Sequence, residues 1–299
     1  MKSQPWDHIF KSPFCLIDNQ YYQPWREKKL KNYPVDPAEI LVEIEDPTNI
    51  STAERGQIKS AIERCNMALY RFKHTDGEDR DMIRAFSASL GLAKLDKHLC
   101  TDGHGVTALQ CETETQRKLY IPYTDRAINW HTDGYYNQPE DQIQGMVLHC
   151  VRSSESGGSN FLLDHEMIYL RLRDENPDWI AALMQKDAMT IPPNENATEE
   201  LNQYRPGAVF AVNRETADLH MRFTARKRNV IWKDDPLITA ALERIHELLA
   251  HEESILRLTM EPGMGLICNN IPHGREAFND SEEQHRLMYR VRSFDRVDV

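Results

Sequence analysis

In the first third of the chain, short apolar runs alternate with segments whose apolar residues recur at helical spacing. The runs at 40–44 and 67–72 predict strands, because each is brief, continuous and bounded by polar or turn residues. Between them, Ser51 and Glu54 have the spacing of a capping box, which predicts the start of a helix. Apolar residues recurring at intervals of four after the second run predict another helix. We therefore expect residues 39–104 to form a strand and helix region packed on a core.

From residue 105 onward, short apolar runs separated by turn residues dominate the pattern. The runs at 144–151 and 287–294 predict strands, and several briefer runs lie between them. An insert at about 164–255 has the amphipathic spacing of helices, most clearly at 236–251. Many short strands with few long helices predict a mainly β protein with flanking helices, folded as a sandwich or barrel.

No linker rich in Gly, Ser or Pro divides the chain, so we expect a single domain over residues 1–299. Residues 1–38 are rich in aromatic residues and Pro, and we interpret them as an irregular N-terminal arm packed on the body. Residues 105–299 are expected to form the core, with the helical insert inside them. A chain of this length is long enough to bury a large hydrophobic core.

Composition excludes several classes of function. The hydrophobic fraction of 40% and the charged fraction of 28% are ordinary for a soluble globular protein, and no apolar run reaches membrane-spanning length. A net charge of −11 argues against a nucleic-acid surface, although a local basic pocket remains compatible with it. Six scattered cysteines without a Cys-x-x-Cys pair, and an N-terminus without a signal peptide, predict reduced thiols in a cytoplasmic protein. The sequence leaves homo-oligomerisation open.

The strongest candidate chemistry lies in the tetrapeptide His-Thr-Asp-Gly at 131–134. In extended backbone, residues two apart point to the same side, so His131 and Asp133 are expected to present an imidazole and a carboxylate together. A second His would complete a facial set of two His and one carboxylate, which holds non-haem Fe(II). His273, just beyond a strand-like run, is the natural third ligand.

The same tetrapeptide occurs at 74–77, so context has to choose between the two copies. His74 lies in a charged stretch containing Gly, which predicts an exposed turn. His251 begins another His-x-carboxylate match, but it ends a helical pattern. Only His131 follows Trp and precedes aromatic residues and an apolar strand, and we therefore prefer it.

Four landmarks in order give the chain a family resemblance. They are Trp-His-Thr-Asp at 130–133, Gly-Gly-Ser-Asn at 157–160, the strand and Asn that precede His273, and Arg-Leu-Met-Tyr-Arg at 286–290. Over roughly residues 40–296 the chain resembles the Fe(II)/2-oxoglutarate-dependent oxygenases of the taurine dioxygenase and clavaminate synthase-like group. The resemblance implies a double-stranded β-helix, or jelly-roll, core. It also implies Fe(II), 2-oxoglutarate and O2 as the cofactor and cosubstrates.

The resemblance also implies roles for individual residues. His131, Asp133 and His273 would be the metal ligands. Arg286 matches the Arg that pairs with the distal carboxylate of 2-oxoglutarate, and Asn160 stands where a polar group contacts the same cosubstrate. The implied reaction oxidises a C–H bond while 2-oxoglutarate loses CO2 to become succinate. Hydroxylation, desaturation and oxidative cleavage all stay open.

Arg290 resembles the family's Arg for the substrate's anion, and by even spacing it shares a strand face with Arg286. A small-molecule substrate with a carboxylate, sulfonate or sulfate is therefore expected. Tyr135 is a candidate for shaping the substrate pocket, although core packing is its alternative role. The basic segment 220–232 lies where family members build substrate-covering loops, but such a segment is most often just solvated.

Two other classes of function are compatible with the same pattern. A zinc-dependent jelly-roll hydrolase would keep the metal ligands, but the sequence offers no evident general base and leaves the two arginines unexplained. A non-catalytic jelly-roll binding module would not need a facial triad. Arg286 and Arg290 have an alternative role as surface ion-pair partners, and His149 is expected to be a packed strand histidine.

Overall fold

The computed structural model describes residues 12–75, 77–96, 105–112, 120–193 and 202–299. The expectations for Asp76, Cys100 and the first eleven residues of the arm fall outside these described residues. The chain divides into two compact units, each built from three separate segments. Unit 1 comprises residues up to 33, 130–142 and 163–254, and unit 2 comprises 34–129, 143–162 and 255–299. The single-domain interpretation stays a prediction.

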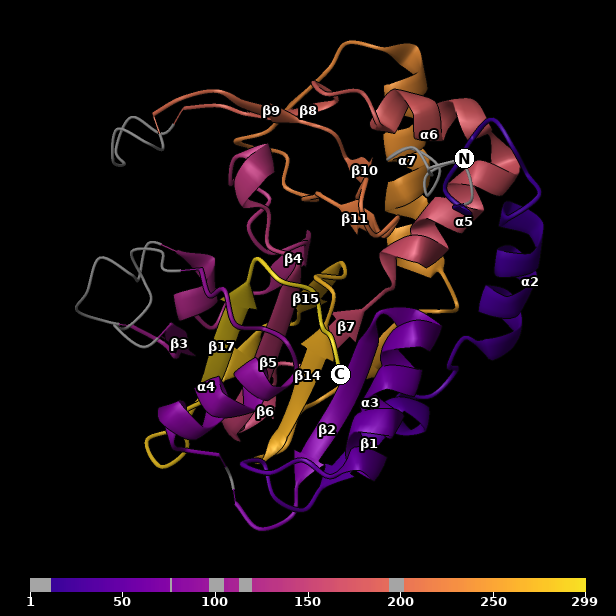
Figure 1. Ribbon diagram of the computed structural model, residues 1–299. Helices are drawn as coiled ribbons and strands as arrows, with labels where there is room; N and C mark the ends of the chain where they lie inside the picture. Colours follow the sequence, from indigo (N-terminus) through magenta and orange to yellow (C-terminus); the bar gives the residue numbers. More distant parts are fainter. Residues whose placement is uncertain (1–11, 76, 97–104, 113–119, 194–201) are drawn as a thin grey trace. The chain divides into compact units, whose positions relative to one another are not determined.

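Unit 2 contains a six-stranded sheet (Figure 1). Its strands, in spatial order, are β1 (Leu41–Ile44), β2 (Met67–Phe72), β14 (Met264–Cys268), β5 (Gly145–Arg152), β17 (Leu287–Ser293) and β3 (Val106–Leu109). β1 and β2 are parallel, and the other neighbours are antiparallel. The four central strands are almost entirely buried, which agrees with their continuous apolar patterns.

A smaller, four-stranded sheet has the order β13 (Leu256–Leu258), β7 (Asn160–Leu162), β15 (His273–Arg275) and β4 (Ile128–His131). A short antiparallel pair, β6 (Ser156–Gly157) and β16 (Phe278–Asn279), completes the strands of unit 2. Short 3-10 helices lie at Pro37–Ile40 and Ile121–Tyr123. The protein is mainly sheet with some helices, as the pattern predicted.

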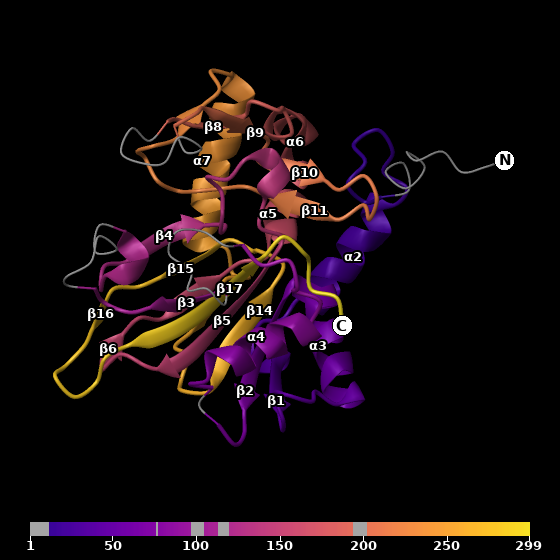
Figure 2. The same ribbon diagram turned by 60° about the vertical axis from the view of Figure 1, so that its left-hand side comes forward.

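Two helices cover one face of the six-stranded sheet, α3 (Thr52–Cys65) and α4 (Arg80–Ser89), as Figures 1 and 2 show. The capping box predicted at the start of α3 is confirmed, because the Ser51 hydroxyl accepts from the backbone of Glu54 while the Glu54 carboxylate accepts from that of Ser51. From α4, the Phe86 ring packs 4.9 Å from the Tyr70 ring of β2. Aromatic burial of this kind anchors the helix to the sheet.

The described part of unit 1 contains four α-helices. Its helices are α2 (Tyr22–Asn32), α5 (His165–Glu175), α6 (Pro177–Leu183) and α7 (Pro236–His251), with a 3-10 turn at Pro139–Asp141. Its strands are the antiparallel pair β10 (Phe210–Val212) and β11 (Leu219–Met221), and a sheet of β12 (Ile231–Trp232), β8 (Met189–Ile191) and β9 (Arg205–Gly207). Asp164 caps α5, because its side chain accepts a hydrogen bond from the Glu166 backbone N–H.

The structure corrects the expectation of an irregular N-terminal arm, because residues 22–32 form α2. No apolar stripe predicts this helix, and no side chain caps its start. Contacts with α5 hold it instead: Lys29 pairs with Asp164 and Glu166, and the Trp25 ring lies 6.5 Å from that of Tyr169. Tertiary contacts therefore override weak local propensity here.

A second, smaller correction concerns α7. Leu237 lies within the amphipathic segment predicted at 236–251, but 40% of Leu237 is exposed while Ile238 is fully buried. The buried set then runs at Ile238, Ala241, Leu242 and Ile245, which is the spacing of one helical face.

Among the described helices, none is long and apolar enough to cross a membrane. The five described cysteines are free thiols, of which Cys15, Cys65, Cys150 and Cys268 are buried and Cys111 is exposed. Cytoplasmic localisation stays a prediction.

Candidate functional site

In unit 1, the backbone turns the side chains of His131 and Asp133 to the same side. Between them, Thr132 is fully buried and points away: its hydroxyl accepts from the Phe223 N–H at 3.0 Å, and its own N–H donates to the Phe223 carbonyl at 3.0 Å. The His131 Nε2 lies 3.9 Å from Asp133 Oδ1, and the two side chains are 15% and 4% exposed. An imidazole and a carboxylate therefore lie together at the end of β4, largely shielded from water.

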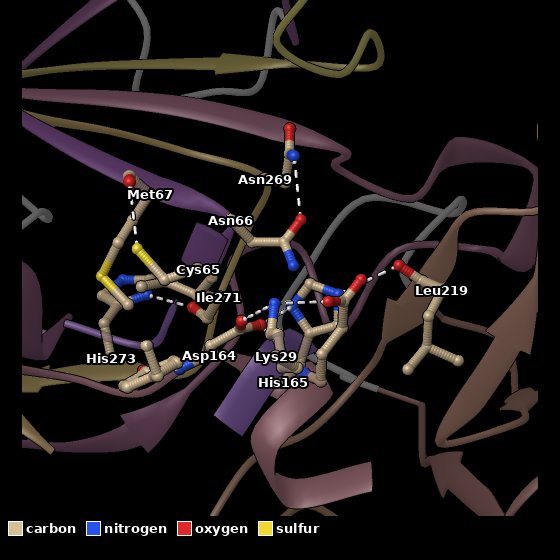
Figure 3. A network of polar contacts seen from close by, with 12 residues as sticks. Lys29, Cys65, Asn66, Met67, Asp164, His165, Leu219, Asn269, Ile271 and His273 are labelled. Atoms are coloured by element: carbon tan, nitrogen blue, oxygen red, sulfur yellow. Dashed lines mark hydrogen bonds and ion pairs between the residues drawn. The ribbon is translucent and has the colours of Figure 1, made fainter. Parts of the chain in front are cut away.

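In unit 2, His273 opens β15 and is buried. Its Nδ1 lies 2.9 Å from the carbonyl oxygen of Ile271, a contact visible in Figure 3. A carbonyl oxygen only accepts, so Nδ1 carries the proton and Nε2 keeps a lone pair available for a metal. The preceding turn is held by amides: Asn269 donates to Asn66 at 3.0 Å, and Asn270, with a φ of +50°, donates to the Ile143 carbonyl.

Gly274, next to His273, permits a close approach of chains within unit 2. A Cβ at this position would lie 2.0 Å from the Phe161 ring and 2.7 Å from the carbonyl oxygen of Ile128. Only hydrogen fits there, and β15 is accordingly the neighbour of β4 in the four-stranded sheet. β4 itself continues from Ile128 to His131.

A small pocket in unit 2 is lined by two of the predicted cosubstrate residues, Arg286 and Asn160. Arg286 is 6% exposed, its guanidinium lies 5.1 Å from the Phe278 ring centre, and burial lowers its pKa. Within the described residues it forms no ion pair with a carboxylate, and Asn160 Oδ1 is buried without a hydrogen-bond partner. The cavity therefore offers a buried positive charge and an open polar atom. Its other lining residues are Ser153, Ser154, Gly158, Thr259, Met260 and Met288.

Arg290 lies on β17, where it is buried and opposite Leu148 of β5. The register shifts between Leu287 and Met288, and Arg286 precedes the strand. An irregularity of this kind interrupts the two-residue alternation, so even spacing alone does not put Arg286 and Arg290 on one face. Arg290 is not among the residues that line the cavity.

Tyr135 follows the His131 loop and is half-buried, with its ring 5.3 Å from that of Tyr136. Burial raises the pKa of its phenol. Its carbonyl accepts a hydrogen bond of 2.7 Å from Arg222 Nε. This contact corrects the expectation that the whole basic segment 220–232 is solvated, because Arg222 is only 2% exposed while residues 226–228 are exposed. The flanking apolar residues of β11 were a sequence signal for burial.

The competing histidines lie where the sequence predicted. The His74 side chain is 69% exposed and its Nε2 lies 2.7 Å from Glu45 Oε1. His251 ends α7. His149 is fully buried in β5, with its Nδ1 2.9 Å from the Tyr70 hydroxyl.

Comparison with known proteins connects this geometry to a family. The model of the taurine catabolism dioxygenase TauD, TfdA family matches residues 28–292. The chain belongs to this family. The TauD, TfdA assignment covers both units and confirms the resemblance found in the sequence.

Among curated relatives, a uridine-5'-phosphate dioxygenase from Amycolatopsis sp is 28% identical over 173 residues, covering 54% of this chain and 59% of the relative. One from Streptomyces sp is 28% identical over 176 residues, covering 56% and 62%. The match thus spans about six tenths of the length of either relative.

Solved structures show that this member of the TauD, TfdA family shares its fold with oxygenases. The non-heme iron oxygenase OrfP, in complex with Fe and alpha-ketoglutaric acid, has a TM-score of 0.64 and 16% identity, covering 83% of this chain and 82% of that one. A taurine dioxygenase from Burkholderia xenovorans has a TM-score of 0.53 and 19% identity, covering 88% and 89%.

Proposed function

We propose that the protein is an Fe(II)/2-oxoglutarate-dependent oxygenase whose iron is held by His131, Asp133 and His273. Two imidazoles and one carboxylate are the donor set that suits non-haem Fe(II). Among the described residues, these three form a group of His and Asp side chains that could hold a metal ion. The observation that carries the proposal is this group of three donors, in which the Nδ1–H bond of His273 to the Ile271 carbonyl fixes the tautomer that leaves Nε2 unprotonated.

The cosubstrate is proposed to bind in the cavity of unit 2. Arg286 would pair with the distal carboxylate of 2-oxoglutarate through its planar fork of N–H donors, with Asn160 beside it. The support is a buried guanidinium that lines a small pocket and forms no ion pair with a carboxylate among the described residues. We further propose that the six-stranded and four-stranded sheets are the two sheets of a jelly-roll.

With its metal and cosubstrate bound, the centre would supply the oxidation of a substrate C–H bond by O2, coupled to decarboxylation of 2-oxoglutarate to succinate. The chain's own residues bind and orient the reactants. Asp133 and the two histidines would hold the metal, Arg286 would fix the cosubstrate's far end, and burial of these groups would exclude water.

The prime substrate is proposed to be a small anionic molecule, with Arg290 and Tyr135 as substrate-binding residues. The curated relatives support an anion, since by name they act on uridine 5'-phosphate. Neither the zinc hydrolase nor the binding module has comparable support, because these comparisons name dioxygenases and an iron oxygenase.

An anaerobic titration with Fe(II) and 2-oxoglutarate tests this function. We expect the weak visible charge-transfer band of the chelate in the wild type and in His74→Ala, whose histidine lies on the surface. His131→Ala and Asp133→Ala should lose the band and the bound iron. Their iron affinity should fall by more than about 100-fold, because losing only a supporting partner of a ligand already costs about 10- to 100-fold.

Absence of the band in the wild type would reject the oxygenase. Loss of iron in His74→Ala would instead move the metal site to the other copy of the tetrapeptide.

A further inference from the structure

In unit 1, Arg205 and Arg222 are buried beside each other and have no carboxylate partner among the described residues. Arg205, on β9, is 3% exposed, and its Nε and Nη1 have no hydrogen-bond partner. Arg222, just after β11, is 2% exposed and donates to the carbonyls of Arg205, Met189 and Tyr135 at 2.9, 2.8 and 2.7 Å. Within the described part of the chain, neither guanidinium forms an ion pair with a carboxylate.

The two side chains are close enough to influence each other. Burial, followed by the charge of Arg205, lowers the pKa of Arg222 to about 10. Burial alone lowers the pKa of Arg205. Gly207 provides the space, since a Cβ there would lie 2.8 Å from Arg222 Nη1. The fold therefore keeps two cations together in a buried place and leaves some of their donors unused: three backbone contacts occupy only three of the five N–H groups of Arg222.

Another buried cation in the same unit shows the ordinary arrangement. Lys29 lies 2.5 Å from both the Asp164 and the Glu166 carboxylates, and Figure 3 draws Lys29 beside Asp164. Its charge is fully compensated inside the protein. The Arg205 and Arg222 pair differs, because its acceptors among the described residues are neutral backbone carbonyls. An uncompensated buried charge is strongly destabilising, so a counter-charge from outside the described residues would stabilise the pair.

We infer that Arg205 and Arg222 bind a dianionic group of the substrate, and that this group is a phosphate monoester. Two guanidiniums carry two positive charges, which a carboxylate or sulfonate would only half neutralise. A tetrahedral dianion neutralises both and accepts several N–H bonds from their planar forks. The inference rests on the proposed oxygenase function, and it specifies the class of substrate.

Contacts of Arg222 and its neighbours connect the proposed anion site to the backbone around the proposed metal ligands. Arg222 Nε holds the carbonyl of Tyr135, two residues beyond the proposed ligand Asp133. The chain from 222 to 225 also holds the proposed metal loop, because Phe223 bonds to Thr132 and the Ala225 N–H donates to the Trp130 carbonyl at 2.8 Å. Anion binding at the pair would therefore stiffen the backbone that presents His131 and Asp133. Arg205 acts as a specificity residue and Arg222 as a positioning residue.

The test measures anion binding to the full chain without iron. Wild-type melting temperature is compared in inorganic phosphate, methyl phosphate and acetate at equal ionic strength, near pH 7.5, with affinities from calorimetry. We expect both phosphates to stabilise the protein more than acetate does. Arg205→Gln should weaken phosphate binding by about tenfold or more, while melting at or above the wild-type temperature without anion. The control Arg228→Gln removes an exposed arginine from the basic segment and should bind phosphate as the wild type does.

Equal stabilisation by phosphate and acetate in the wild type would overturn the inference, as would undiminished phosphate binding in Arg205→Gln. If the protein binds inorganic phosphate but does not bind methyl phosphate, the pair is a site for free phosphate only. That result would reject the assignment of a phosphate monoester substrate. If Arg205→Gln fails to fold, Arg205→Lys keeps the charge without the fork and should still weaken binding about fivefold; unchanged binding overturns the proposal. The charge-transfer band of Fe(II) and 2-oxoglutarate should persist in Arg205→Gln, so failure here is separate from failure of the oxygenase function.

Discussion

At the scale of single residues, environment separates groups that look identical in sequence. Two copies of His-Thr-Asp-Gly occur in the chain, but one histidine is 69% exposed beside Glu45 and the other is 15% exposed beside Asp133. The same reasoning applies to arginines. Arg257 lies 3.8 Å from the Glu276 carboxylate on the surface, whereas the buried Arg286 forms no such pair within the described parts of the chain. Burial without compensation is what distinguishes a binding group from a solvated one.

Arg286→Ala should raise the 2-oxoglutarate concentration needed for activity by about 30-fold or more. The physical reason is that losing one partner of a desolvated charge pair typically costs about 2–5 kcal/mol. Iron binding should stay within a few-fold of wild type. The measurement is cosubstrate affinity by titration of the Fe(II) chelate, with Arg257→Ala as the surface control. An unchanged cosubstrate affinity would transfer the role to Arg290 or Arg292.

At the scale of elements, α2 shows how a helix can depend on partners distant in sequence. Tyr22 donates to Asp174 at 2.7 Å, and Arg26 pairs with the same carboxylate at 2.6 Å. Lys29 lies in a buried pair of contacts with Asp164 and Glu166. The helix therefore docks on α5 through polar contacts along one side, which an apolar periodicity does not reveal.

Lys29→Met should lower the free energy of unfolding by about 3–5 kcal/mol, because removing one partner of a buried pair leaves the other charge uncompensated. Urea unfolding measures the loss, and Lys31→Met, on the exposed side of α2, is the matched control. The carboxylates raise the pKa of Lys29 despite its burial. Its stabilising contribution is therefore full below about pH 10.5, the value of an unfolded Lys, and is lost as pH rises through the folded pKa. Equal midpoints for the two variants would show that the pair contributes nothing.

At the scale of the whole molecule, the balance of charges and the path of the chain through the two units both bear on how the fold is held together. Asp and Glu residues number 47 and Lys and Arg residues 36, so at least 11 carboxylates have no cation of their own, and several carboxylates are held by hydrogen bonds. The Val35 backbone N–H and then Arg64 lower the pKa of Glu39; Lys73 and His74 lower that of Glu45. Each compact unit also joins three segments distant in sequence, so neither forms from one continuous stretch.

Because the pKa values of carboxyl groups such as Glu39 and Glu45 are lowered in the folded protein, acid should destabilise it. A carboxyl whose folded pKa is lowered contributes stability above its unfolded pKa, about 3.9–4.3, and loses it as pH falls through the folded value. Urea midpoints measured between about pH 6 and pH 3 should stay nearly constant at first and then decrease below about pH 4.5. The urea dependence should keep its slope if the same surface unfolds. A midpoint that rises on acidification would contradict this view, since repulsion among excess carboxylates would then dominate.

The sequence by itself determined the elements whose cause is local. The capping box of α3, the amphipathic face of α7, the Asp164 cap of α5 and the buried strands β5 and β17 follow from spacing within a few residues. The same holds for the relation of His131 to Asp133, because alternation in extended backbone needs no distant partner.

Only the tertiary structure decided the features that depend on distant partners. The helix α2 exists through contacts with α5, more than a hundred residues away in sequence. The irregularity between Leu287 and Met288 is defined against β5, and no period within one strand reveals it. The burial of Arg205 and Arg222 likewise follows from how separate strands enclose them. Charge and periodicity can be read from the sequence, but the desolvation of a side chain depends on the packed molecule. Desolvation is what gives a charged side chain its binding role.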